Sequence, residues 1–231
     1  MSKVLVIGDL HAPATHADYF SFVRKMQRKY DTDKTVFIGD IVDNEAISFH
    51  VKSPELPAAV NEYREAMKIV HKWHRAFPDA YVCIGNHDER INKRAKSQGI
   101  PSLYLKDFNE IYNTSGWKWE WEHTIDDVTY THGTGWGGKT PSFNAACHTR
   151  KSIVSGHTHT ISAISWISNG DNSIFGMNVG AGVDSKHPAM NYSKFSLKKP
   201  VFSCGIVIHG HPYLEVRTVS YTHLRAHETV L

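Results

Sequence analysis

The sequence predicts an α/β fold: a four-layer α/β/β/α sandwich, in which two packed mixed sheets are flanked by helices. In the first half of the chain, short apolar runs alternate with longer amphipathic segments, which is typical of βαβ units and a parallel sheet. In the second half, short strand-like runs follow one another with few helices between them, which favours mostly antiparallel pairing. Helices outside two packed sheets would bury the apolar faces of both.

The first half of the chain supplies three of the expected strands. Short apolar runs that end in glycine cover residues 4–8, 35–39 and 81–85. Amphipathic segments separate them, one around residues 20–26 and a longer one from about residue 55 to 77. Their apolar side chains recur with helical spacing, so we expect two helices that connect three parallel strands.

The second half begins with a segment of alternating character. Residues 117–122 alternate aromatic and polar side chains with period two, the pattern of a half-exposed strand. Further strands are expected at residues 128–131, 152–155, 161–167, 173–177, 202–208 and 213–217. We find no internal repeat or linker in this part, so it reads as the continuation of the same domain.

Size and composition agree with one domain, which we expect to span residues 1–218. The chain has 231 residues, of which 41% are hydrophobic, enough for a substantial core. Its three cysteines form no Cys-x-x-Cys pair, which favours a reducing compartment. No apolar run has the length of a signal peptide or a membrane span, so we expect a cytoplasmic protein (host cytoplasm if viral) without a membrane partner. A net charge of +3 is weak evidence for a nucleic-acid partner.

The end of the chain reads differently from the rest. Residues 219–229 resemble a sequencing adapter from transposon libraries, translated in one frame. An ordinary polar tail is the alternative, but a match of this length is hard to obtain by chance. We therefore expect a non-native tail at 219–231 and leave it out of the fold prediction.

Five segments share one pattern: an apolar run, in most cases a glycine, and then residues of metal-ligand type. They are Gly8-Asp9-Leu10-His11, Gly39-Asp40-Ile41-Val42-Asp43, Gly85-Asn86-His87-Asp88, His132-Gly133 and Gly156-His157-Thr158-His159. In an α/β sheet, ligand sites form beyond the carboxyl ends of the strands. Because each segment follows an expected strand, we expect these polar side chains to converge. Glycine there allows a tight turn without a Cβ clash.

The residue types predict what binds at this place. The candidate metal ligands are Asp9, His11, Asp40, Asn86, His132, His157 and His159. Imidazole and carboxylate donors without a thiolate suit Mn²⁺, Fe, Zn²⁺ or a similar borderline ion. Seven donors are too many for one tetrahedral ion and fit two ions that share a carboxylate. Paired ions about 3.5–4 Å apart typically clamp the attacking and leaving oxygens of a phosphoryl displacement.

In this order the motifs resemble those of the calcineurin-like metallophosphoesterase superfamily: D-x-H, G-D-x-x-D, G-N-H-D, H-G and G-H-x-H. The match runs from Asp9 to His159. Each motif alone is weak, since an Asp after a strand often only caps a turn, but all five in order form a specific signal. The resemblance implies the metallophosphatase fold and a metal-dependent phosphoric ester hydrolase. It also implies two divalent transition-metal ions (Mn, Fe, Zn or Ni, with Mn favoured).

The resemblance further implies how the ligands are divided and which residues act on the substrate. One ion would be held by Asp9, His11, Asp40 and His159, and the other by Asp40, Asn86, His132 and His157. A hydroxide between the ions, its pKa lowered by them, would attack phosphorus. His87 is then not a ligand: it faces the substrate and protonates the departing oxygen or stabilises its charge. Asp43 would hydrogen-bond His87 and orient it, with capping of the next helix as the alternative for this residue.

Outside the motifs, one basic residue is a candidate for binding substrate. Arg90 follows His87 at the start of an expected helix, which also carries Lys93, Arg94 and Lys96. A solvated helix face explains these charges equally well. Arg90 is nearest to His87, so it is the best candidate for contacting a substrate phosphate.

The substrate class stays open at the level of sequence. A phosphodiester, in a nucleic acid or a small nucleotide, and a phosphomonoester are both compatible with the motifs. The serine/threonine protein phosphatases usually have Arg-Gly after G-D-x-x-D and Glu after G-N-H, where this chain has Asn44-Glu45 and Asp88, so that alternative is disfavoured. A non-catalytic scaffold or binding protein with the same fold is disfavoured because every ligand and His87 are present. We expect a small phosphoesterase of bacterial or phage type.

Overall fold

The computed structural model describes residues 1–50, 57–188 and 199–217. Two of the sequence predictions concern residues that lie partly or wholly outside these ranges. The expected non-native tail at 219–231 lies outside the described residues, and so does the beginning of the segment expected to be helical from about residue 55.

The first sheet contains the three parallel strands expected from the first half of the chain. Its order is β11-β10-β1-β2-β3-β4. Its strands are β1 (Lys3–Ile7), β2 (Lys34–Phe37), β3 (Ala80–Cys83), β4 (Trp117–Glu120), β10 (Ser203–Ile208) and β11 (His211–Val216). Strands β1 to β4 are parallel, and β10 pairs antiparallel with β1. The last part of the chain therefore returns to the first sheet.

The second sheet is built from the middle of the chain in the order β5-β6-β7-β9-β8. Its strands are β5 (Glu122–Ile125), β6 (Val128–Thr131), β7 (Ser152–Ser155), β8 (Ser162–Ser168) and β9 (Ser173–Val179). The pairs β6–β7 and β7–β9 are parallel, whereas β5–β6 and β8–β9 are antiparallel. This sheet is thus mixed, and less antiparallel than its sequence pattern suggested.

One expected strand proves to be two. The period-two pattern of residues 117–122 continues across Trp121, but β4 ends at Glu120 in the first sheet and β5 begins at Glu122 in the second. Trp121 lies between them and is exposed. The alternation of side chains is preserved through this crossing, so periodicity alone does not reveal that the chain changes sheets.

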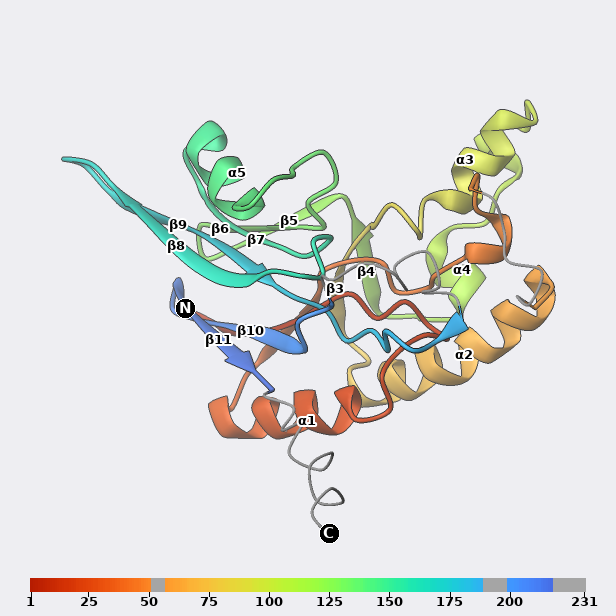
Figure 1. Cartoon of the computed structure of the whole chain (residues 1–231), viewed down its shortest axis with the longest axis horizontal. Helices are drawn as coiled ribbons and strands as arrows, with labels where there is room; N and C mark the ends of the chain where they lie inside the picture. The colour runs from red at the N-terminus through yellow and green to blue at the C-terminus, as the bar shows by residue number, and fades with distance from the viewer. Residues whose placement is uncertain (51–56, 189–198, 218–231) are drawn as a thin grey trace, which may run out of the picture.

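Helices cover the two outer faces of the sheets. They are α1 (Tyr19–Tyr30), α2 (Ala59–Ala76), α3 (Arg90–Ser97), α4 (Phe108–Tyr112) and α5 (Pro141–Thr149), with short 3₁₀ turns η1 (Glu45–Ile47) and η2 (Ser102–Tyr104). In Figure 1, α1 and α2 lie below the first sheet, α5 lies on the far side of the second, and α3 projects at the upper right. The predicted four-layer α/β/β/α sandwich is confirmed. Within the described residues, no helix is long and apolar enough to cross a membrane.

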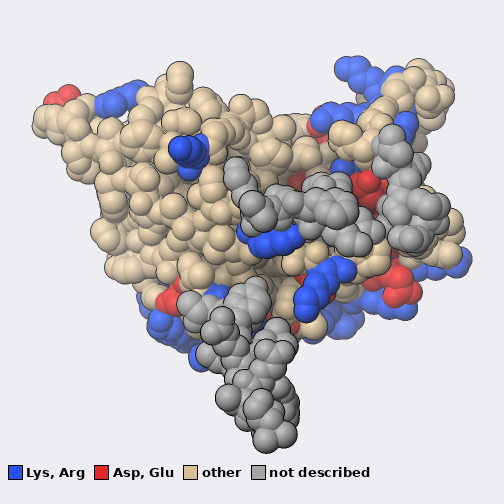
Figure 2. Space-filling view, viewed as in Figure 1, with Lys and Arg blue, Asp and Glu red and all other residues tan. Residues whose placement is uncertain are grey.

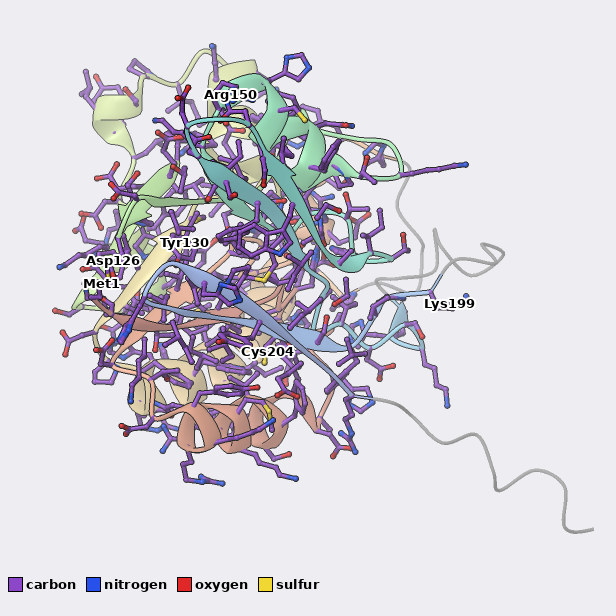
Figure 3. The ribbon with its side chains drawn as sticks, turned by 90° about the vertical axis from the view of Figure 1, so that its left-hand side faces the viewer. Met1, Asp126, Tyr130, Arg150, Lys199 and Cys204 are labelled. Atoms are coloured by element: carbon purple, nitrogen blue, oxygen red, sulfur yellow. The ribbon has the colours of Figure 1, made fainter. Side chains whose placement is uncertain are left out.

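Alternating side chains of the central strand feed two separate cores. Leu5 and Ile7 of β1 pack toward the helices α1 and α2, whereas Val4 and Val6 pack toward the second sheet. Figure 3 labels one member of each core, Cys204 on the helix side and Tyr130 between the sheets. Fully burying one such aliphatic side chain stabilises a fold by about 1.5–3 kcal/mol. The two cores hold the carboxyl ends of β1, β2 and β3 close to those of β6 and β7.

Candidate metal centre

The five polar segments predicted from the sequence each follow a strand, as expected. Those of the first sheet follow β1, β2 and β3, and those of the second follow β6 and β7. Backbone hydrogen bonds join neighbouring segments: the amide of His11 donates to the carbonyl of Asp40 at 2.8 Å, and the amide of Gly156 donates to the carbonyl of His132 at 3.1 Å. The two parallel sets of strand ends therefore meet in one place.

The structure brings all seven candidate ligands together, each in close contact with at least one other. On one side, Nε2 of His159 lies 3.0 Å from Oδ2 of Asp9 and 3.1 Å from Nε2 of His11. Nε2 of His11 lies in turn 3.4 Å from Oδ2 of Asp40. The donor atoms of these four residues lie within 4.8 Å of one another, a spacing that a single cation can satisfy.

The remaining candidate ligands make contacts that begin at the carboxylate of Asp40. Oδ2 of Asp40 lies 3.2 Å from Nε2 of His132. That nitrogen is 3.0 Å from Oδ1 of Asn86 and 3.2 Å from Nδ1 of His157. Asp40, His132 and His157 form a second group whose donor atoms lie within 4.8 Å of one another. Asp40 thus belongs to both groups, through one oxygen.

Asp40 is held so that one oxygen is free to face both groups. Its Oδ1 accepts a hydrogen bond from the amide of His87 at 2.8 Å, which leaves Oδ2 pointing between His11 and His132. Burial by itself raises the pKa of Asp40, but the charges of His132 and His87 and the hydrogen bond from His11 lower it well below its usual value. Asp40 is therefore an anion in the interior, and it needs cations around it.

The outer hydrogen bonds of two histidines decide which nitrogen faces inward. Nδ1 of His11 donates to Oδ1 of Asp43 at 2.8 Å, and Nδ1 of His132 donates to the carbonyl of Ile38 at 3.0 Å. When each ring is neutral, Nε2 is the nitrogen that carries the lone pair, and in both rings Nε2 points at Asp40. Hydrogen bonds of this kind commonly fix the tautomer and orientation of metal-binding imidazoles.

The backbone is strained at the same positions. His11, Asp40 and His157 have φ values of 46°, 48° and 62°, in the left-handed region that costs a residue with a side chain about 1–2 kcal/mol. Two glycines make room for the carboxylates: a Cβ at Gly85 would lie 2.1 Å from Oδ1 of Asp40, and one at Gly156 would lie 2.2 Å from Oδ1 of Asp9. The glycines of G-N-H and G-H-x-H are thus needed for close approach as much as for turning.

The donor set fits divalent metal ions. Imidazole nitrogens face one another at 3.1 Å and 3.2 Å around a shared buried carboxylate, and imidazole and carboxylate groups are common ligands of divalent metal ions. Each group supplies three or four donors, and Asn86 adds an amide oxygen to the second. Cation positions on either side of Asp40 would match the division of ligands that the sequence resemblance implies.

A third group of possible ligands has a different explanation. Oδ1 of Asp43 lies 2.8 Å from Nδ1 of His11 and 2.9 Å from Nδ1 of His87. Both nitrogens are well placed to donate hydrogen bonds to this oxygen, and Nδ1 of His87 also lies 2.8 Å from the Asp43 carbonyl. Burial raises the pKa of Asp43, but the hydrogen bonds from His11 and His87 lower it below its usual value. Asp43 therefore orients two imidazoles at once, one of them a candidate ligand.

Arg90 lies beside His87 and is itself fixed in place. Its Nη2 lies 3.4 Å from Nε2 of His87. Its Nη1 donates to Oε2 of Glu45 and to the Asp43 carbonyl, both at 2.8 Å. Glu45 is at the start of η1, whose first amides are capped by the carboxylate of Glu62 from α2 at 2.7 Å. The sequence does not show this role of Glu45, because it depends on a contact with Arg90 across 45 residues.

Asp88 is a second residue whose role the sequence did not show. It is fully buried, and its carboxylate accepts hydrogen bonds from the amides of Ile41 (3.0 Å), Val42 (3.3 Å) and Gly85 (3.0 Å). Burial and the charge of Asp40 raise its pKa to about 7. Asp88 thus ties the segment after β2, which carries Asp40, to the segment after β3. Its position directly after His87 was the available signal.

Comparison with protein-family models decides the family. The model described as calcineurin-like phosphoesterase matches residues 2–211. This chain belongs to the calcineurin-like phosphoesterase family. The resemblance seen in the five motifs is thereby confirmed, and it extends beyond the last motif through β8, β9 and β10. The family implies phosphate-ester substrates, and its members usually bind divalent metals.

Solved structures with a similar fold are distant in sequence. Vacuolar Protein Sorting 29 from Cryptosporidium parvum is 15% identical over 94% of this chain and 96% of that chain, with a TM-score of 0.45. The phosphoesterase YfcE from E. coli is 16% identical over 89% of this chain and 88% of that chain, with a TM-score of 0.42. Comparison with curated proteins gives no match.

Proposed function

We propose that this protein is a dinuclear metal-dependent phosphoesterase that hydrolyses a phosphodiester or a phosphomonoester. The single observation that carries the proposal is the position of Asp40. Its Oδ2 lies 3.4 Å from His11 and 3.2 Å from His132, and each of these imidazoles belongs to a separate group of donors. A carboxylate shared in this way is what two closely spaced ions require.

The seven candidate ligands would hold the two ions, one on each side of Asp40. When bound, such a pair neutralises phosphate charge and supplies a nucleophilic water at neutral pH. In hydrolysis the water oxygen bonds to phosphorus, the ester P–O bond breaks, and the departing oxygen takes up a proton. His157 and His159 are partly exposed, whereas Asp9 and His11 are fully buried, so the substrate approaches from the side of His157 and His159.

His87 is placed to supply that proton. Its Nδ1 is committed to Asp43, and its Nε2 lies 4.0 Å from Oδ2 of Asp40, at the edge of the ligand cluster. A ring held in this way presents Nε2 to a group that binds over the metal centre. We assign the leaving-group proton to His87 and the orientation of its ring to Asp43.

Arg90 would bind the substrate phosphate next to His87. Its guanidinium has a buried partner in Glu45, so the group is fixed before substrate arrives and little side-chain freedom is lost on binding. Nη2, at 3.4 Å from Nε2 of His87, is the part that faces the site. The pairing with Glu45 partly neutralises the positive charge of Arg90. It also holds the guanidinium next to the position that a phosphate oxygen bound over His87 would take.

The alternatives make different demands on the same residues. A non-catalytic scaffold has no need for left-handed backbone at His11, Asp40 and His157, which costs stability unless the donors have a use. For a protein phosphatase of the serine/threonine type, Asn44 would usually be Arg. Here Nδ2 of Asn44 donates to the His87 carbonyl at 3.1 Å and thus supports the loop instead of the substrate.

The test is hydrolysis of small chromogenic esters by the full chain. We expect Mn²⁺-dependent turnover of bis-nitrophenyl phosphate, nitrophenyl phosphate or both, which a chelator abolishes and added Mn²⁺ restores. Asp40→Asn, purified in parallel, is the control for contaminating enzymes and should show no turnover. Absence of metal-dependent hydrolysis on both esters, in protein that contains metal, would contradict the proposal.

A further inference from the structure

A basic ridge leads away from the His87 side of the metal centre. We define it as residues 90–106, which comprise α3, η2 and the segment that joins them. It carries five Lys or Arg residues, namely Arg90, Lys93, Arg94, Lys96 and Lys106, and no Asp or Glu. Every residue from Lys96 to Tyr104 is exposed. Figure 2 shows Lys and Arg gathered at the upper right, where α3 projects in Figure 1.

The charges on this ridge are only partly neutralised. Arg90 pairs with Glu45, and Lys93 pairs with Glu89. Arg94 donates from Nε to the Ile47 carbonyl at 2.6 Å, which anchors it without a counter-charge. Among the described residues, neither Lys96 nor Lys106 has a carboxylate within ion-pair distance. The outer end of the ridge therefore presents positive charge that an anion could neutralise.

The ridge also contains a hollow and exposed apolar side chains. The hollow has a volume of about 660 Å³, and its lining includes Lys96, Ile100, Lys106 and Asp107. Asp107 is already used, because its Oδ1 accepts from the amide of Glu110 as the cap of α4. Tyr104 is 73% exposed, so its ring is accessible to a ligand.

We propose that the ridge binds a single-stranded nucleic acid whose scissile phosphodiester lies at the metal centre. The inference rests on the proposed phosphoesterase function and names its substrate class. The phosphates that follow the scissile one would contact Lys96 and Lys106, and a base would stack on the exposed ring of Tyr104. Basic grooves combined with exposed aromatic rings are the usual means of binding single strands without sequence preference.

The dimensions of the ridge favour a strand over a small nucleotide. Lys96 is six residues beyond Arg90 along α3, about 9 Å at 1.5 Å per residue. Phosphates along one strand of a duplex are about 3.4 Å apart in helical rise, and they are farther apart in an extended single strand. Lys96 would therefore serve a phosphate beyond the one at Arg90. A mononucleotide held at the metal centre has no further phosphodiester to pair with Lys96.

A second copy of the chain fits the ridge less well. In a twofold dimer the same surface meets itself, so the lysines of one copy would face those of the other. Like charges brought together in an interface cost several kcal/mol. The polyanion is the occupant that the charge of the ridge favours.

The experiment measures binding of a fluorescein-labelled oligothymidylate of about twelve nucleotides, within the range that single-strand-binding folds cover. Anisotropy is followed with the full chain in a chelator, over a series of NaCl concentrations. Lys96→Glu should weaken binding on the order of tenfold and make the slope of log K against log salt shallower by about 0.7. Tyr104→Ala should weaken it on the order of tenfold, and Tyr104→Phe, which keeps the ring, should not.

The matched control is Lys151→Glu, which reverses one exposed charge next to Arg150 on the α5 side of the molecule. It should leave binding within about twofold of wild type. An equal loss in Lys96→Glu and Lys151→Glu would overturn the proposal, since attraction would then be diffuse. Sedimentation that shows a dimer in wild type and a monomer in Tyr104→Ala would also overturn it, by assigning the ridge to self-association.

Small-ester turnover separates this inference from the proposed function. Bis-nitrophenyl phosphate is too short to reach Lys96 or Tyr104 at the outer end of the ridge, so Lys96→Glu and Tyr104→Ala should hydrolyse it at the wild-type rate. Turnover of the small ester without binding of the oligonucleotide would overturn the nucleic-acid inference and leave the phosphoesterase standing. Binding that depends on Lys96 and Tyr104, without turnover of any ester, would support the ridge and refute the phosphoesterase.

Discussion

Oδ2 of Asp40 and Nε2 of His132 lie 3.2 Å apart, with both side chains almost completely buried. The same oxygen lies 3.4 Å from Nε2 of His11. One carboxylate thus joins a loop of the second sheet to two loops of the first. The candidate metal centre is therefore complete only when both sheets are packed together, and Asp40 is its central residue.

Replacing Asp40 by Asn should remove metal binding from both halves of the site. The amide is nearly the same size but carries no charge, so the buried imidazoles lose their common anion. We expect affinity for Mn²⁺ to fall at both positions, as measured by calorimetric titration, with turnover lost in parallel. The control is Asp171→Asn, at the exposed turn between β8 and β9, which should bind metal as wild type. Loss of a single metal equivalent in Asp40→Asn would contradict a bridging role.

His87→Ala should fail for a different reason. His87 contacts Asp43 and lies 4.0 Å from Asp40, outside the two groups of shared donors, so metal content should stay near wild type. Removing a general acid typically lowers kcat by about 10²–10⁴-fold. The deficit should be small for a nitrophenyl ester, whose oxygen departs without a proton, and large for an alkyl ester. Equal deficits on both esters, or a lost metal equivalent, would show that His87 is not the acid.

Asp88→Asn should weaken the hydrogen bonds that connect the loop after β2 to the loop after β3, although Asp88 is not a candidate ligand. The amide has one acceptor oxygen, so it cannot accept from Ile41, Val42 and Gly85 as the carboxylate does. A buried amide left unpaired costs about 1–3 kcal/mol, and we expect the free energy of unfolding in urea to fall by that amount. Metal affinity should fall too, because Gly85 precedes Asn86. Asp107→Asn, which keeps a good helix cap, is the matched control and should change neither.

Metal affinity should depend on pH. Burial lowers the pKa of His132, but the charge and hydrogen bond of Asp40 outweigh it and raise the pKa to about 9 in the metal-free protein. A ligand must lose its proton to bind metal, so affinity should rise as the pH is raised from about 6 to 9 and level off above that. Calorimetry in two buffers of different ionisation heat would report the proton released. A constant affinity over this range, with no proton release, would refute the assignment of His132 as a ligand.

The strand ends could be predicted from the sequence because the residues there follow a local rule. An apolar run buried on both faces, then a glycine, then a donor such as Asp9 or His157, can be read without knowing the topology. The glycines had a further reason that the sequence did not show: Gly85 and Gly156 leave room for carboxylates from other loops. Contacts of this kind depend on distant parts of the chain.

What could not be predicted depends on pairing between distant segments. Nothing local in residues 117–122 shows that the chain changes sheets at Trp121, since its alternation continues unbroken. Helix α5 is short and only weakly amphipathic, so its sequence lacks a clear helical period. Glu45 and Asp88 look like ordinary acidic residues in the sequence. Glu45 acquires its role by accepting from Arg90, and Asp88 by accepting from backbone amides of the loop after β2.

The number of metal ions per chain tests the central claim most directly. Full-length protein is saturated with Mn²⁺, freed of excess by dialysis, and measured by elemental analysis against an accurate protein concentration. If Asp40 bridges two ions, the metal content should approach about two equivalents per chain, and it should do so in His87→Ala as well. A clean value of one equivalent or less in the wild-type protein would contradict the dinuclear centre.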